Sequence, residues 1–146
     1  MTIVKHLMLG LAVVGLLAAG ACSSDTTDTS TSSVTAPTTP LVTQTFTGTV
    51  QIGGSDSNPF TVVGSNGTLS VTLTLAGPPA TITEGLGVGQ YVGTTCTLLN
   101  GGYGSYQAGP APQLSGTIAA GNFCVMVYDV GNQSAPLAYS VTVSHY

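Results

Sequence analysis

Apolar and hydroxyl-bearing residues alternate in short runs from residue 46 to the end of the chain. The clearest runs are GTLSVTLTL at residues 67–75 and LAYSVTVSHY at residues 137–146. Because successive side chains of a strand point to opposite faces, a period of two is typical of half-buried strands. Gly, Pro and Asn separate the runs, and no window of eleven or more residues after 45 has the helical period. The pattern therefore predicts an all-β domain.

Two stretches refine this prediction. Asn66-Gly67 follows Val62-Val63, and both residues of such a pair tolerate positive φ, which favours a two-residue hairpin. NFCVMVYDV, residues 122–130, is apolar at both parities, so we expect a central strand that is covered on both sides. About eight short strands in ~100 residues predict an antiparallel β-sandwich.

The first residues have a different pattern. MTIVKH carries Lys5, and an apolar run of 13 residues follows from Leu7 to Ala19. That length is typical of a signal peptide and is shorter than the ~20 residues that span a bilayer. We therefore expect a signal peptide at 1–21, a linker at 22–45 and a domain at 46–146. The linker is rich in Ser and Thr and has too few apolar residues for a packed core, so we expect it to be disordered.

The stretch LAAGACSS, residues 17–24, resembles the lipobox of bacterial lipoproteins, in which small residues precede a cysteine that becomes the lipidated N-terminus. This resemblance implies that Cys22 carries acyl chains, and two or more chains anchor a protein stably to a membrane. Ser23 in place of Asp implies export to the outer membrane in a bacterium that has one. The alternatives are ordinary cleavage after Ala19-Gly20-Ala21, which leaves Cys22 as a free thiol, and a retained membrane helix.

Charge is scarce throughout the chain. Lys5 is the only Lys or Arg, and the acids are Asp25, Asp28, Asp56, Glu84 and Asp129. Proteins bind the phosphates of nucleic acid chiefly through Lys and Arg, so a nucleic-acid partner is excluded. A chain with little charge and much Thr, Ser and Gly is typical of an extracytoplasmic β-protein.

Three runs of the domain are similar to motifs of bacterial pre-peptidase C-terminal-like (PPC-like) domains. These runs are GTLSVTLTL, AAGNFCVMVYDVGN and PLAYSVTVSHY. Gly67, Leu69, Val71 and Leu73 fall on the first motif; Gly121, Phe123, Val125 and Val127 on the second; Tyr139, Val141 and Val143 on the third. The resemblance implies a jelly-roll-like sandwich, usually a non-catalytic part of secreted proteins and sometimes a binder of extracellular polymers.

Cys96 and Cys124 are the two cysteines of the expected domain. Export places them in an oxidising compartment, where an even pair most often forms a disulfide. Closing the loop between them would contribute about 3.5 kcal/mol in the chain-entropy description. The alternatives are two buried free thiols and a metal site with His145, although these spacings match no zinc motif.

Catalysis has few candidate residues here. A triad would need His145, Asp129 and a serine, but His145 is next to the C-terminal residue, so we expect it to be solvated and frayed. A glycosidase pair would need two of Asp56, Glu84 and Asp129 at ~5–9.5 Å, whereas we expect these acids in turns or facing solvent. The chain is therefore expected not to be an enzyme, with a small secreted hydrolase as the competing hypothesis.

Oxygen ligands for calcium occur in two stretches, Asp56-Ser57-Asn58 and Asp129-Val130-Gly131-Asn132. Asp and Asn are also common in turns, where their side chains bond the local backbone. We favour this second explanation and expect no cofactor, with calcium as the alternative.

Tyr103 and Tyr106 lie in a Gly-rich stretch, Asn100 to Gln113, which we expect to be a loop. Aromatic side chains on such a loop can stack on sugar rings or contact a peptide. The alternative is that both tyrosines lie back on the end of the sandwich. The sequence thus predicts a lipid-anchored, non-catalytic module of the cell envelope that binds an extracellular polymer or protein, or serves a structural role.

Overall fold

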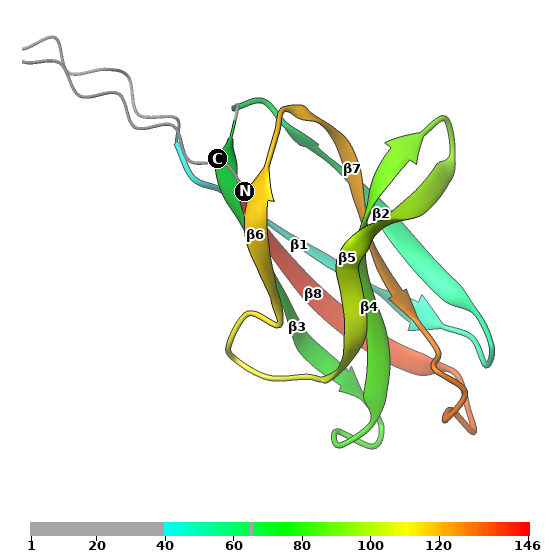
Figure 1. Ribbon diagram of the computed structural model, residues 1–146. Coiled ribbons are helices and arrows are strands. Elements are labelled where there is room, and N and C mark those ends of the chain that lie inside the picture. The colour runs from blue at the N-terminus through cyan, green and yellow to red at the C-terminus, as the bar shows by residue number, and fades with distance from the viewer. Residues whose placement is uncertain (1–39, 65) are drawn as a thin grey trace, which may run out of the picture. The chain divides into compact units, whose positions relative to one another are not determined.

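The computed structural model describes residues 40–64 and 66–146, which form an antiparallel β-sandwich (Figure 1). Its strands are β1 (Val42–Val50), β2 (Ser55–Val62), β3 (Gly67–Gly77), β4 (Thr83–Val92), β5 (Thr95–Gln107), β6 (Leu114–Ile118), β7 (Gly121–Tyr128) and β8 (Leu137–His145). One sheet has the order β1-β8-β3-β6 and the other β2-β7-β4-β5. The predicted fold class, an all-β sandwich of about eight strands, is confirmed.

The core lies between the inner faces of the two sheets. The alternation predicted for residues 67–75 and 137–146 sends Val71, Leu73, Val141 and Val143 inward, where each is fully buried. β7 lies between β2 and β4, so the prediction of a central strand in this part of the chain is confirmed. The expectation of cover on both sides is wrong, because the outward residues Asn122, Met126 and Tyr128 are exposed or only half-buried on the outer face of the sheet.

β1 begins at Val42, four residues before the expected start of the domain at 46. Val42, Thr43, Gln44 and Thr45 pair in register with β8, from His145 back to Thr142. These residues were expected in the linker because Thr and Gln dominate them. Their backbone nevertheless completes a sheet, since an edge strand needs only one neighbour for its hydrogen bonds.

The hairpin expected at Asn66-Gly67 is wrong. Asn66 has the positive φ that the prediction required, at 57°. The flanking strands β2 and β3 nevertheless belong to different sheets: β2 pairs with β7, and β3 pairs with β6 and β8. The turn therefore takes the chain from one sheet to the other. The residue types of a turn determine its backbone conformation, but they do not determine which strands pair.

A polar network joins the two sheets. The hydroxyl of Tyr139 in β8 donates to Asp56 Oδ2 of β2 at 2.8 Å and accepts from Asn58 Nδ2, also at 2.8 Å. Gly48 of β1 leaves room for this group, because a Cβ there would lie 2.8 Å from the Tyr139 hydroxyl. Burial and the bond to Asp56 raise the pKa of Tyr139 above its ordinary value of 10.0, which keeps the phenol protonated.

We expect Tyr139→Phe to lower the free energy of unfolding by about 1–3 kcal/mol, because Asp56 would lose its donor inside the sandwich. The raised pKa of Tyr139 also makes the wild type lose stability as the pH rises above 10, where the unfolded state releases this proton and the folded state does not. That contribution should vanish in Tyr139→Phe. Urea unfolding at pH 7 and at alkaline pH measures both effects, and equal midpoints for the two proteins at pH 7 would contradict the role of the network.

The predicted signal peptide, Cys22 and most of the linker lie outside the described residues, so lipidation stays a prediction. Within the part of the chain that is described, no helix is long and apolar enough to cross a membrane.

Candidate functional site

A disulfide joins Cys96 of β5 to Cys124 of β7, as predicted, with a Cα–Cα distance of 5.8 Å. β4 lies between these two strands in the sheet, and Gly89 of β4 pairs with both of them. A Cβ at Gly89 would lie 2.9 Å from Cys124 Sγ and 2.6 Å from the carbonyl oxygen of Thr97. The bridge therefore rests against a strand position that has no side chain.

β5 bulges where it passes Val88. Gly87 pairs with Tyr103 and Gly89 pairs with Leu98, so one residue of β4 faces the four residues 99–102 of β5. Gly101 has a φ of 76°, a region that glycine adopts without strain. A bulge bends its strand and changes where the side chains point. Here it interrupts pairing at an edge strand and leaves Leu99 38% exposed.

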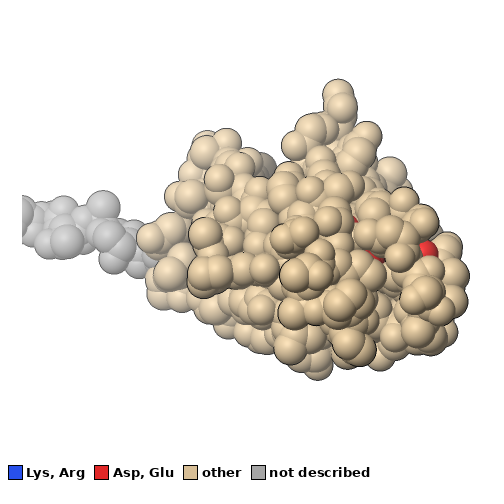
Figure 2. Space-filling view, turned by 90° about the horizontal axis from the view of Figure 1, so that it is seen from below, with Lys and Arg blue, Asp and Glu red and all other residues tan. Residues whose placement is uncertain are grey.

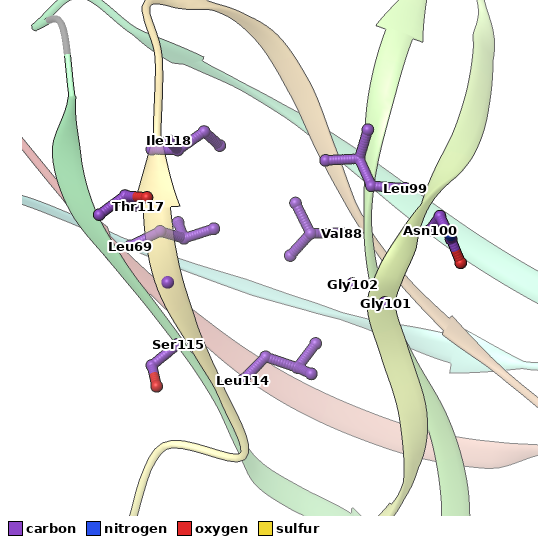
Figure 3. Close-up of a pocket in the computed structure, with 11 residues that line it drawn as sticks. Leu69, Val88, Leu99, Asn100, Gly101, Gly102, Leu114, Ser115, Thr117 and Ile118 are labelled. Atoms are coloured by element: carbon purple, nitrogen blue, oxygen red, sulfur yellow. The ribbon is translucent and has the colours of Figure 1, made fainter. Parts of the chain in front are cut away.

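The bulge forms one wall of an apolar cleft between the edge strands β5 and β6, which we call the β5–β6 cleft. Its volume is about 210 Å³. Leu69, Leu114 and Ile118 line one side, and Val88, Leu99, Gly101 and Gly102 line the other. Figure 3 shows Leu69, Leu114 and Ile118 projecting toward Val88 and Leu99, whereas Ser115 and Thr117 point away. The cleft is thus apolar inside and polar at its rim.

Two edges flank this cleft. β6 pairs with β3 and β5 pairs with β4, and within the described residues neither has a strand on its other side. Free strand edges present backbone N–H and C=O groups to any extended segment that approaches. β3 is longer than β6, and the part of its edge that β6 leaves unpaired is covered at Leu73. The side chain of Gln113 accepts from the N–H of Leu73 at 2.7 Å and donates to its carbonyl oxygen at 3.3 Å.

The predicted loop from Asn100 to Gln113 is largely strand, because β5 continues to Gln107. The two candidate tyrosines point to opposite faces. Tyr103 is 51% exposed on the outer face, and Tyr106 is half-buried and packs against the core. A separation of three residues along a strand reverses the face, so the structure does not bring the two rings together.

Tyr128 is a neighbour of Tyr103 that sequence reasoning missed. It lies on β7, on the outer face of the sheet, and its ring packs directly over Gly85. A side chain at position 85 would collide with this ring. Burial and the nearby hydroxyls of Tyr103 and Tyr106 raise the pKa of Tyr128. The signal was present in the outward parity of NFCVMVYDV, which places Met126 and Tyr128 on one face.

The expectation of a frayed, solvated His145 is wrong. His145 is 1% exposed, and its ring centroid lies 5.6 Å from that of Phe60. Because β8 lies between β1 and β3, pairing with Val42 and Leu69 holds His145 in the sheet. Asp129 lies near the opposite end of β8, across a strand of about 26 Å. The hypothesis of a His145–Asp129 triad is therefore wrong.

Two of the three acids are not where the sequence reasoning expected them. Asp56 lies on β2, half-buried, and bonds Tyr139, whereas Glu84 lies on β4 and is 0% exposed. A substrate cannot reach Glu84 in this structure, so a glycosidase pair that includes it is wrong. Burial raises the pKa of Glu84, the hydrogen bond from Gln133 lowers it by less, and the charge of Asp129 adds a smaller increase.

Asp129 follows the turn chemistry that we favoured over calcium. Its carboxylate accepts from the backbone N–H groups of Gly53 at 2.7 Å, Gly131 at 2.7 Å, Asn132 at 3.1 Å and Gln133 at 3.3 Å. These bonds lower the pKa of Asp129. The other stretch, Asp56-Ser57-Asn58, lies within β2, where Asp56 and Asn58 bond the hydroxyl of Tyr139.

The described residues hold no group of three His, Cys, Asp or Glu side chains that could bind a metal ion. Figure 2 shows a surface almost free of charge, with acidic atoms at one end of the face in view.

No protein-family model matches this chain, and no curated protein matches it. Among solved structures, the chain is similar to PliG of Aeromonas hydrophila, a periplasmic lysozyme inhibitor of g-type lysozyme. The TM-score is 0.50 and the identity 15%, and the match covers 71% of this chain and 86% of PliG. The likeness shows the fold alone.

Proposed function

We propose that this protein is a lipid-anchored, non-catalytic module of the bacterial cell envelope that binds a protein partner through the β5–β6 cleft. The observation that carries the proposal is the cleft itself, an apolar cavity of about 210 Å³ between two free strand edges. An apolar side chain of the partner enters the cleft, and the extended backbone beside it pairs with an exposed edge. Such strand addition is a general mode of peptide recognition.

Two features support the location. Residues 17–24 resemble a lipobox, with Cys22 as the anchored residue, and the Cys96–Cys124 disulfide is typical of proteins that fold outside the cytoplasm. At this location the protein can contact other proteins of the cell envelope or proteins outside the cell. PliG, which has a similar fold, is a periplasmic inhibitor of g-type lysozyme, so this enzyme is the first partner to test.

A photo-crosslinking amino acid at position 99 in intact cells tests the cleft. Leu99 is at its wall, and Leu75, which is 50% exposed on β3 and does not line the cleft, is the matched control position. We expect a protein adduct from position 99 and none from position 75. No adduct at 99, or the same adduct from both positions, would contradict binding at the cleft.

With the crosslinked protein, or with purified g-type lysozyme, Leu99→Asp should weaken binding about tenfold or more, because a charge cannot enter an apolar contact without a partner. Leu75→Asp should bind as the wild type does. Titration calorimetry measures both affinities, and circular dichroism checks that the variants fold. Equal affinity of the two variants would show that the partner binds elsewhere.

A polymer-binding role is the second candidate, and the exposure of Tyr103 beside Met126 and Tyr128 favours it. A flat, uncharged aromatic surface can stack on sugar rings. Retention on insoluble cell-wall polysaccharide that is lost in Tyr103→Ala, and kept in Leu99→Asp, would favour this function over protein binding at the cleft.

A further inference from the structure

A buried acid and a buried amide face each other near the end of the sandwich where β4 begins. Glu84, on β4, is 0% exposed, and Gln133, in the loop between β7 and β8, is 9% exposed. Gln133 Nε2 donates to Glu84 Oε2 at 2.9 Å. The remaining oxygen of each group, Oε1 of Glu84 and Oε1 of Gln133, is buried and has no hydrogen-bond partner.

An acceptor oxygen that is buried without a donor destabilises the folded protein, and this site has two of them. The two belong to groups that one hydrogen bond already joins, and a single proton on Glu84 gives the missing donor. A protonated carboxyl and a primary amide can then bond reciprocally, N–H to one carboxyl oxygen and O–H to the amide oxygen.

The surrounding charges favour this neutral form. Asp129, in the same loop, stays ionised because backbone N–H groups surround its carboxylate, and its negative charge opposes a second one on Glu84. Tyr106 of β5, an uncharged phenol, is the cross-strand neighbour of Glu84. His145 lies at the far end of β8, and the sequence has no Lys or Arg after Lys5.

We propose that Glu84 is protonated in the folded protein, donates its O–H to Gln133 Oε1, and thereby closes a pH-sensitive latch between β4 and the loop 129–136. The latch also includes the bond from Asn132 Nδ2 to the carbonyl oxygen of Thr83, at 2.8 Å. When Glu84 ionises, its carboxylate requires water, and Gln133 must leave the interior. Because Asp129 bonds the backbone of Gly53, opening also frees the loop between β1 and β2.

The sign of the effect follows from the raised pKa of Glu84. The unfolded chain releases this proton near 4.5, and the folded state holds it to higher pH. The contribution of the latch to stability is therefore complete below pH 4.5 and declines as the pH rises through the folded pKa. The population of the open loop rises about tenfold for each pH unit above that value.

A cation between the same oxygens is the competing explanation for their lack of donors. The buried oxygens without a donor here are two, Oε1 of Glu84 and Oε1 of Gln133. Calcium usually takes six to eight oxygen ligands. Proton binding needs only the two groups that are present.

Glu84 is the only glutamate in the sequence, which makes a direct test simple. In the full chain labelled with ¹³C-glutamate, the one carboxyl signal that moves with pH reports Glu84. We expect the midpoint of this titration to lie above 4.5. At the pH of the midpoint, the amides of residues 131–133 should begin to exchange faster, by more than the pH dependence of intrinsic exchange accounts for. Glu84→Gln, which can form the same reciprocal pair, should keep these amides protected at all pH values. Gln133→Met should loosen them at low and high pH alike.

Three results would overturn the proposal. The first is a Glu84 midpoint at or below 4.5. The second is a Glu84→Gln variant that exchanges as fast as the wild type does at high pH. The third is a rise in melting temperature with calcium that occurs in the wild type and not in Glu84→Gln, which would assign the oxygens to a cation. Asp129→Asn should lower the Glu84 midpoint, because it removes the negative charge that opposes ionisation of Glu84.

Discussion

Replacing both cysteines of the disulfide, as Cys96→Ala with Cys124→Ala, is expected to lower the free energy of unfolding by about 3.5 kcal/mol. The bridge closes a sequence separation of 28 residues, so its loss lets the unfolded chain explore many more conformations. A small domain has a net stability of roughly 5–15 kcal/mol, and this loss is a large share of it. We also expect the end of the β4–β5 hairpin to loosen first, because the bridge holds β5 to β7 across β4.

Urea unfolding with and without the bridge measures this effect. The wild type, its reduced and alkylated form and the double variant should be compared at one pH, with Cys22→Ala as the control, because Cys22 lies outside the sandwich sequence. A loss below about 1 kcal/mol in the double variant would show that packing alone holds the hairpin. Hydrogen exchange at residues 89–98 should report local opening before global unfolding.

The sequence was sufficient for the features that depend on period and composition. Alternation predicted the sheets and the inward positions of residues such as Leu73 and Val141, and the double parity of residues 122–130 predicted the central strand β7. The disulfide followed from an even pair of cysteines in a chain that the sequence predicts to be exported. The first two of these predictions depend on the pattern within one short segment, and the third depends on the number of cysteines.

The features that failed depend on which strands meet. Asn66 makes the turn that its residue type favours, yet the turn joins two sheets instead of two paired strands. His145 and Glu84 are polar and near turns or termini, so exposure was the natural expectation. Their burial is set by partners far along the chain, Phe60 and Gln133, which no local pattern identifies.

The β5–β6 cleft had a signal that was misinterpreted. Asn100-Gly101-Gly102 predicts the beginning of a loop, but glycine inside a strand pattern also indicates a bulge. β5 continues beyond it, and the bulge turns Leu99 toward the opening between the sheets. The candidate pair Tyr103 and Tyr106 failed for a related reason, since strand geometry separates residues three apart. A single bulged strand over residues 95–107 accounts for the opposite faces of the two tyrosines and for the position of Leu99, whereas the cleft also depends on β6 of the other sheet.

Gly89→Ala is expected to destabilise the domain by about 3 kcal/mol, and the matched Gly116→Ala to leave it unchanged or slightly more stable. A methyl at Gly89 would lie 2.6 Å from the carbonyl oxygen of Thr97 and 2.9 Å from the sulfur of Cys124. Neither atom is the end of a flexible side chain, so β5 or the disulfide must move. A methyl at Gly116 of β6 meets nothing within 4 Å.

The two variants separate steric contact from the general effect of replacing glycine in a strand. Thermal unfolding under oxidising conditions should show the loss for Gly89→Ala alone, together with faster reduction of the disulfide by a small thiol, since moving β5 exposes the sulfurs. In the background that lacks both cysteines, part of the cost of Gly89→Ala should disappear, because the sulfur contact is gone and β5 can move away. An equal cost in both backgrounds would mean that the bridge does not confine β5 against β4 at this position, and the close approach would then be a property of strand pairing alone.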